Sequence, residues 1–331
     1  MIHLKKNQLN ELLEELENLG KFSKQARVFY QNIVSLHPRK QESIEQAMML
    51  TSTTRNKLLI TDVEQQKLAR TTVGFFGLSV GSHAALTWMM LSRAQVIKIA
   101  DPDIISPSNL NRLRLGWSTI GKRKVDVIKN IVLDMHPYVS VHTLTKTQGK
   151  LMEAFCRTKP RVDCIVDEID DLEGKMQLRS LARNLRIPLI SAVDVGENVI
   201  VDIERYDTER NTKFFLGRIP DIEHINLATL TPLQKARLII SLVGLDHNSS
   251  AMLTSLFAIG REIGTWPQLG STATIAGGII ATTIKRITLG ESIKSGRYVF
   301  DMDTLFGLSE GVAEKKRLQK LKKNIHVKFG I

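Results

Sequence analysis

Cysteine is scarce in this chain of 331 residues, which contains only Cys156 and Cys164. Two cysteines exclude a disulfide-stapled scaffold and a zinc site of the four-cysteine kind. They suit a reducing compartment, because thiols stay unpaired there. We therefore expect a cytoplasmic protein.

Long apolar runs are also missing. Residues 263–284 carry no charge, but the stretch includes Pro267, Gln268 and several Ser and Thr residues, which lower its mean hydropathy below that of a membrane span. The first twenty residues carry acidic side chains where a signal peptide would be apolar, so we expect none. The sequence predicts a protein with no membrane association.

Acidic residues are fewer than basic ones, 34 against 46, which gives a formal net charge of +12. A basic surface attracts nucleic acids and phosphate-bearing substrates such as ATP. Aromatic residues make up only 5% of the chain, and no basic motif interleaved with aromatics occurs. We therefore interpret most of this charge, including the basic stretch 315–328, as a solvated surface.

A nucleotide-binding βαβ unit is predicted at residues 73–101. An apolar run at 73–76 stops at Gly77, a small-residue turn continues to Gly81, and a helical pattern follows. A second apolar run, 96–100, ends on Asp101. The turn places backbone N–H groups at a helix N-terminus, where phosphate binds, and an acid about twenty residues further on is suited to a ribose hydroxyl.

Carboxylates also follow a later apolar run, which ends in Asp167 and is succeeded by Asp170 and Asp171. Ligands of an open parallel sheet bind at the carboxyl ends of its strands. We predict an α/β fold of the Rossmann-like, doubly wound kind with a mostly parallel sheet. A helical extension over 1–52 precedes an ATP-binding domain over 53–207, and residues 208–331 form a helical and strand extension that completes the same fold.

The order of these motifs resembles one known superfamily. A strand ending in Asp101-Pro-Asp103 is followed by SNLNR at 108–112, GKRK at 121–124 and a strand ending in DEID at 167–170. This combination is similar to the ThiF, MoeB and UBA adenylating enzymes of the ubiquitin-activating superfamily. The resemblance covers Arg55 to Asp207 and extends more faintly to the end. The segments GLSVG at 77–81, IERYD at 203–207 and WPQL at 266–269 resemble ThiF-like domains that some bacteria fuse to a nitroreductase-like domain, and we expect the stand-alone form here.

The resemblance implies an ATP site at the glycine turn. Gly77, Ser79 and Gly81 correspond to the loop around the adenylate. Asp101 corresponds to the acid that receives the ribose hydroxyls, and Asp103 lies in the same nucleotide-binding motif.

The resemblance also implies four catalytic residues. Arg112 and Lys124, together with Asn109, correspond to groups that face the triphosphate. Asp170 corresponds to the aspartate that binds Mg²⁺. Arg55 corresponds to an arginine that reaches the partner subunit's ATP, so a homodimer is expected.

The implied reaction is the activation of a carboxylate as an acyl-adenylate. Attack of a carboxylate on the α-phosphate brings two anions together, so Mg²⁺, a guanidinium and an ammonium must neutralise charge. A thiol relay is not expected, because no cysteine follows Cys164 and the run that contains Cys164 is predicted to be a buried strand. The carboxylate substrate remains open among a small protein, a peptide and a small molecule.

Several positions depart from the family pattern. Leu113 replaces a glutamine, Ser79 a glycine, Asp171 an asparagine and Lys175 an arginine. These changes favour an alternative interpretation, a non-catalytic nucleotide-binding scaffold or sensor. A second alternative is a tRNA-modifying, dehydratase-like member with tRNA as its partner, which the +12 charge suits. A nicotinamide dehydrogenase ranks last, since SNLNR and GKRK have no role in one.

Overall fold

The computed structural model describes residues 4–35, 41–308 and 311–330. Its strands are β1 (Val73–Phe76), β2 (Val96–Ala100), β3 (Ser140–Leu144), β4 (Cys164–Asp167), β5 (Leu189–Val195), β6 (Asn198–Glu204) and β7 (Gly296–Phe300). The helices of the first half are α1 (Lys6–Gly20), α2 (Lys24–Ser35), α3 (Gln41–Ser52), α4 (Asp62–Arg70), α5 (Val80–Ser92), α6 (Lys124–Met135) and α7 (Lys150–Arg157). Those of the second half are α8 (Leu172–Leu185), α9 (Pro232–Val243), α10 (Ser250–Ala258), α11 (Gly270–Leu289), α12 (Met302–Leu305) and α13 (Val312–Phe329).

One mixed sheet forms the centre of the molecule, with the strand order β3-β2-β1-β4-β5-β6-β7. The first five strands of this order run parallel, and β6 and β7 are added antiparallel. Strand order reverses between β1 and β4, and in such folds the crevice at this switch point is where ligands bind. The predicted α/β, Rossmann-like fold is confirmed.

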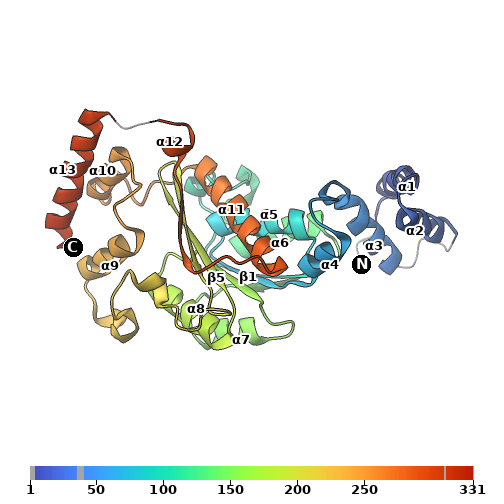
Figure 1. Ribbon diagram of the computed structural model, residues 1–331, viewed down its shortest axis with the longest axis horizontal. Coiled ribbons are helices and arrows are strands. Elements are labelled where there is room, and N and C mark those ends of the chain that lie inside the picture. Colours follow the sequence, from blue (N-terminus) through green and yellow to red (C-terminus); the bar gives the residue numbers. More distant parts are fainter. Residues whose placement is uncertain (1–3, 36–40, 309–310, 331) are drawn as a thin grey trace.

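Helices cover both faces of the sheet, and Figure 1 shows the three layers. Helices α4, α5, α6 and α11 pack on one face, where Phe75, Trp88 and Ile280 are fully buried in one apolar cluster. Helices α7 and α8 pack on the other face, where Phe76 and Leu178 are fully buried. Because the short central strands are buried on both faces, they read in sequence as continuous apolar runs rather than as alternating ones.

The N-terminal helices α1–α3 stand at one end of the molecule, away from the sheet (Figure 1). They share an apolar cluster of their own, which includes Leu12, Leu16 and Ile33. At the opposite end, α9, α10 and α13 form another small cluster around Leu253 and Ile325. The division of the chain at residues 52 and 207 stays a prediction.

Helix α11 lies unusually close to α5. A Cβ added to Gly277 would lie 2.5 Å from Cβ of His83, so glycine is required for the two backbones to approach this closely. The uncharged stretch 263–284 thus supplies a helix buried against the sheet and α5. Within the described ranges, no helix combines the length and the apolar character needed to cross a membrane.

Candidate functional site

The turn between β1 and α5 requires glycine at its first position. Gly77 has a φ of +86°, and a Cβ there would lie 2.2 Å from the carbonyl oxygen of Glu168. Gly81, in the first turn of α5, faces the side chain of Glu168, and a Cβ at this position would lie 3.4 Å from it. The turn therefore presents the N-terminus of a thirteen-residue helix at the switch point, a position that favours a bound anion.

Asp101 is joined to this turn by backbone hydrogen bonds. The N–H of Leu78 donates to Oδ2 of Asp101 at 2.6 Å, and the N–H of Asp103 donates to Oδ1 at 2.8 Å. Burial raises the pKa of Asp101, and the Lys124 ammonium and these two N–H groups oppose the rise. A carboxylate has about four acceptor sites, so these two N–H groups occupy about half of the acceptor capacity of Asp101.

Lys124 opens α6 and belongs to the same cluster. Its Nζ lies 2.8 Å from Oδ2 of Asp103 and 3.6 Å from Oδ2 of Asp101. A cation at a helix N-terminus is unfavourable unless an anion lies beside it. The two aspartates supply that anion, and they hold a buried ammonium beside the glycine turn.

Arg112 reaches the glycine turn from the loop that follows β2. Its Nε donates to Oγ of Ser79 at 2.9 Å, and its NH1 donates to the carbonyl of Ser108 at 3.1 Å. Asn109 shapes this loop, because its Oδ1 accepts from the N–H of Ser106 at 3.1 Å. The structure thus brings Arg112 to Ser79, whereas the recorded hydrogen bond of the Asn109 side chain stays within its own loop.

Sequence reasoning missed His83, which anchors this loop. His83 is buried on α5 and its Nε2 donates to the carbonyl oxygen of Arg112. Burial lowers the pKa of His83, so the neutral ring is favoured. A single histidine on an apolar helix face carries no sequence signal for such a role.

The end of β4 supplies the acidic side of the site. Asp170 is exposed in the loop before α8, while Asp171 caps α8 by accepting from the N–H of Gly174 at 2.7 Å. The Oε1 of Glu168 accepts from the N–H of Ala192 at 2.8 Å. Burial raises the pKa of Glu168 well above its usual value, although the Lys175 ammonium and this hydrogen bond oppose the rise.

Asp194 on β5 is a second residue that sequence reasoning missed. It is 5% exposed, and its Oδ2 accepts from Nε2 of Gln268 at 3.2 Å. Burial raises its pKa, Arg112 opposes that rise and Asp170 adds to it, which places Asp194 in electrostatic reach of both. Strand β5 runs from Leu189 to Val195, so Asp194 lies at its carboxyl end.

Mg²⁺ prefers one or two carboxylates together with nucleotide phosphates and water. Asp170, exposed in the loop between β4 and α8, is a carboxylate of the kind that fits such an ion. Among the residues that the structure describes, no group of three or more His, Cys, Asp or Glu side chains is arranged to hold a metal by itself.

Arg55 lies far from the glycine turn of its own chain. It is exposed in a short 3₁₀ turn (Thr54–Asn56), and the neighbouring Asn56 donates to the carbonyl of Leu91 at the C-terminal end of α5. The glycine turn is at the N-terminal end of α5, and a thirteen-residue helix spans about 20 Å. Arg55 is thus not brought together with the other predicted residues in one chain.

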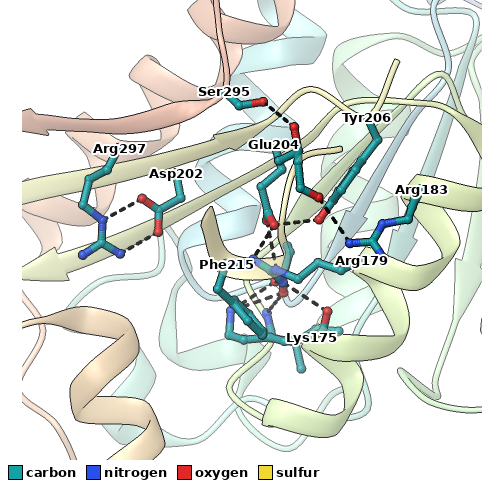
Figure 2. A network of polar contacts seen from close by, with 12 residues as sticks. Lys175, Arg179, Arg183, Asp202, Glu204, Tyr206, Phe215, Ser295 and Arg297 are labelled. Atoms are coloured by element: carbon teal, nitrogen blue, oxygen red, sulfur yellow. Dashed lines mark hydrogen bonds and ion pairs between the residues drawn. The ribbon is translucent and has the colours of Figure 1, made fainter. Parts of the chain in front are cut away.

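A buried ionic network surrounds Arg179, and Figure 2 shows Arg179 together with Lys175, Glu204 and Phe215. The guanidinium of Arg179 lies 2.6 Å from Oδ2 of Asp167 and 2.9 Å from Oε2 of Glu204, and it stacks on Phe215 at 3.8 Å. Lys175 lies 3.3 Å from Asp167. Burial would raise the pKa of Asp167, but the two cations outweigh it and hold that pKa below its usual value. The network ties the end of β4 to α8 and β6.

Two curated relatives match large parts of the sequence. An uncharacterized protein of Mycobacterium tuberculosis, MT1398, is 31% identical over 248 residues, which are 75% of this chain and 34% of that protein. The tRNA threonylcarbamoyladenosine dehydratase of Bacillus subtilis is 30% identical over 173 residues, 49% of this chain and 66% of that enzyme. The chain thus spans about a third of the first relative and just under two thirds of the second.

A solved structure shares the fold. Escherichia coli MccB, crystallised with ATP, superposes with a TM-score of 0.52 at 14% identity, covering 91% of this chain and 89% of that one. The model of the ThiF family matches residues 53–322, which include the glycine turn, both aspartate motifs and Arg112. The resemblance noted in the sequence is therefore confirmed, and the chain belongs to the ThiF family.

Proposed function

We propose that this protein is an ATP- and Mg²⁺-dependent adenylyltransferase that activates a carboxylate as an acyl-adenylate. The observation that carries the proposal is the convergence of Asp101, Arg112 and Lys124 on the glycine turn at Gly77. Adenylyl-transfer chemistry is the chemistry of the family, and the E. coli neighbour MccB was crystallised with ATP. NAD chemistry would leave Arg112 and Lys124 without a role.

In the proposed reaction, a carboxylate oxygen of the substrate attacks the α-phosphorus of ATP. The bond from that phosphorus to the oxygen bridging to the β-phosphorus breaks, pyrophosphate leaves, and a mixed anhydride remains. No proton is transferred in this step. The barrier is largely electrostatic, so fixed cations at the reacting phosphate lower it.

Each side chain has a defined part in this proposal. Arg112 offers a planar fork for phosphate oxygens and Lys124 a point charge, and Ser79 and Asp103 hold these cations in place until nucleotide binds. Asp101 receives the ribose hydroxyls. Asp170 holds Mg²⁺, which neutralises negative charge on the phosphates when bound. Gly81 shapes the glycine turn, and Asn109 shapes the loop that carries Arg112.

We further propose that the adenylate passes directly to an amine or a hydroxyl, without a cysteine thioester. Cys156 and Cys164 are both buried. Burial raises the pKa of Cys156 to about 12 and also raises that of Cys164, so neither forms a thiolate near neutral pH. We also propose a cytoplasmic location, which the scarcity of cysteine supports.

Arg55 supports the proposal of a homodimer. Leu58, Leu59 and Val63 follow it with side chains that are 100%, 83% and 78% exposed. Neighbouring apolar side chains exposed to this degree are typical of an interaction surface. We propose that a second copy covers them and places Arg55 at the ATP site of its partner.

The carboxylate substrate is open to one alternative of another chemical class. The B. subtilis relative is a tRNA threonylcarbamoyladenosine dehydratase, and α13 carries six lysines and one arginine in eighteen residues. We therefore keep tRNA as a second candidate substrate. Binding of bulk tRNA that weakens steeply as salt rises would support it, and indifference to tRNA at low salt would dismiss it.

The first test is calorimetric titration with ATP·Mg²⁺ and, separately, with NAD. We expect wild-type protein to bind ATP·Mg²⁺ and Asp101→Ala to lose that binding, while NAD gives no heat. ATP–pyrophosphate exchange then tests the chemistry, because exchange requires reversible adenylate formation. If the protein binds ATP but catalyses no ATP–pyrophosphate exchange with any class of carboxylate offered as substrate, the result would favour a nucleotide-binding scaffold or sensor. NAD binding in place of ATP binding would overturn the proposal.

A further inference from the structure

A pocket of about 630 Å³ lies beside the antiparallel strands, and its wall combines residues 209–213 with residues 295–297 at the start of β7. The first group follows the end of β6, where Glu204 pairs with Leu189, the first residue of β5. The pocket is therefore next to the amino end of β5, whereas the glycine turn follows the carboxyl end of β1. Four strand spacings of about 4.8 Å separate β7 from β1, so the two sites are roughly 20 Å apart.

Positive charge dominates the wall of this pocket. The wall contains one carboxylate, Glu209, and four cationic side chains, Arg210, Lys213, Arg218 and Arg297. The Oε1 of Glu209 accepts from the N–H of Ser295 at 3.2 Å. Arg210 and Lys213 are exposed, and neither forms an ion pair with any of the residues that the structure describes. The pocket therefore has an excess of positive charge.

Arg297 is the one cation of the wall that an anion already balances. Its Nε and Nη2 donate to the two carboxylate oxygens of Asp202 at 2.7 and 2.6 Å, and Figure 2 shows this fork. Its Nη1 donates to the carbonyl of Val243 at 2.7 Å. Because Arg297 occupies both oxygens of Asp202, this carboxylate is poorly placed to balance a second guanidinium.

Arg218 is half-buried beside Arg297 and has donors to spare. Its Nε donates to the carbonyl of Leu242 at 2.9 Å, and within the described ranges its Nη groups have no acceptor. A Cβ added to Gly244 would lie 2.6 Å from Nη2 of Arg218, so the guanidinium is held against the backbone after α9. A fixed guanidinium with unused donors is suited to a planar or tetrahedral oxyanion.

The charges that face Arg218 also favour an added anion. Burial lowers the pKa of Arg218, and repulsion from Arg297 lowers it further, while Asp202 and Asp246 oppose the change. Asp202 is occupied by Arg297, and Asp246 pairs with Lys322 at 2.8 Å. An anion in the pocket would relieve the repulsion between the two guanidinium groups.

The size of the pocket and the composition of its wall indicate a small phosphorylated molecule. A volume of about 630 Å³ is in the usual range for small-molecule sites. The three cations without a partner suit a group of about two negative charges, which a phosphate ester carries at neutral pH. None of the described wall residues is aromatic, so the pocket offers no platform on which a nucleobase could stack.

We propose that this pocket is a second ligand site, separate from the glycine turn, and that it binds the phosphate group of a small phosphorylated molecule. The Nη groups of Arg218 contact the phosphate at the base of the pocket, and Arg210 and Lys213 add charge at its rim. The site does not depend on the proposed function, because its ligand binds without ATP.

The test measures binding of inorganic phosphate and of glycerol 3-phosphate, a small phosphate ester, by calorimetry. EDTA removes Mg²⁺, and about 150 mM NaCl screens attraction to exposed charges. The pocket variants are Arg218→Gln and Lys213→Gln. Their matched controls are Arg261→Gln and Lys235→Gln, at exposed positions outside the pocket wall. Arg112→Ala tests whether the probe binds at the glycine turn instead.

We expect wild type to bind at least one probe, and the tighter of the two shows whether the pocket prefers an ester or the free ion. The dissociation constant should rise about tenfold in Arg218→Gln and about threefold in Lys213→Gln. Both controls and Arg112→Ala should match wild type. Circular dichroism shows whether each variant is folded, and Lys213→Gln decides the outcome if Arg218→Gln does not fold.

Three results would overturn the proposal. The first is that folded wild type binds neither probe, or that the folded pocket variants bind them as wild type does. The second is a loss of binding confined to Arg112→Ala, which would assign the phosphate to the glycine turn. The third is retention of bulk tRNA but of neither probe, with the tRNA lost in Lys213→Gln, because the pocket would then bind a polymer backbone.

Discussion

Arg179 and Asp167 form an ion pair at 2.6 Å between two fully buried side chains. Asp167 is the last residue of β4, one residue before Glu168 and three before Asp170. Figure 2 shows Arg179 together with Glu204 and Phe215. Glu204 shares the same guanidinium, so removal of Arg179 would leave two buried carboxylates without their common partner. Removal of Arg179 should therefore lower the free energy of unfolding strongly.

We expect Arg179→Met to lower the free energy of unfolding by about 3–5 kcal/mol, the cost of breaking a buried pair from one side. Arg157→Met is the control, because Arg157 pairs with Glu153 on the exposed surface of α7 and such pairs contribute about 0–1 kcal/mol. Urea denaturation measures both. A loss for Arg179→Met no larger than that of the control would contradict the central role of the network.

Two neighbouring glycines on α11 should respond in opposite directions. Gly277→Ala places a Cβ 2.5 Å from Cβ of His83 and should cost about 1–3 kcal/mol, because α11 must move away from α5. Gly278→Ala meets nothing within 4 Å and should add about 0.5–1 kcal/mol of stability in a helix interior. Thermal unfolding distinguishes them, and a stabilised Gly277→Ala would show that the helices are not in close contact.

Glu168 should make stability depend on pH. Its pKa is raised in the folded protein, so its protonated form is favoured by folding, and the contribution is full below the unfolded pKa and lost as pH rises through the folded value. Glu168→Gln keeps an acceptor for the N–H of Ala192 and removes the charge. We expect its melting temperature to exceed that of wild type by a margin that grows from acid to neutral pH.

The matched substitution for this experiment is Glu173→Gln, on the exposed first turn of α8. The difference in melting temperature between Glu173→Gln and wild type should not grow from acid to neutral pH. A constant difference between Glu168→Gln and wild type would show that Glu168 does not titrate with a raised pKa.

Arg112 should be required for pyrophosphate exchange, whereas Arg114 should not. Both arginines lie in the loop after β2, but only Arg112 donates to Ser79 on the glycine turn. We expect Arg112→Ala to lower the exchange rate by about 100-fold or more, as loss of one preorganised cation at a reacting phosphate does. The exchange rate of Arg114→Ala should stay near that of wild type. Equal losses of exchange rate in the two variants would show that Arg112 contributes only general surface charge.

Arg55 should act in trans. We expect Arg55→Ala and Arg112→Ala each to be inactive alone, because one lacks the partner's arginine and the other the phosphate cation. A one-to-one mixture allowed to exchange subunits should recover about a quarter of wild-type activity, since half the dimers carry one intact site. No recovery in a mixture shown to contain heterodimers would contradict the crossed arrangement.

The parallel half of the sheet was predictable because its signals are local. Buried central strands appear as short apolar runs, Gly77 marks the end of the first, and Asp101 and Asp167 stand at or directly after strand ends. Parallel strands bring their carboxyl ends to one edge, so a correct strand assignment is enough to predict that these residues are neighbours. Arg112 and Lys124 were instead identified through the resemblance to the ThiF family, on SNLNR at 108–112 and GKRK at 121–124.

The antiparallel half of the sheet was harder to predict from the sequence. The full length of β5 and its pairing with β6, in which Val195 is opposite Asn198, were not predicted, and Asp194 was therefore missed. Gln268 contacts Asp194 across 74 residues of sequence, and no local pattern specifies a partner that distant.

The amino-acid sequence by itself determined the α/β order of elements, the glycine turn and the residue types available for ATP, because propensity, turn geometry and helix capping act over a few residues. Only the tertiary structure decided which charges are buried together and which cations line one pocket. Arg179 shows the difference, since a helical arginine is usually exposed and becomes a core residue only when β4, β6 and Phe215 enclose it. Burial and long-range pairing are properties of the packed chain, and they arise when distant segments exclude water from one another.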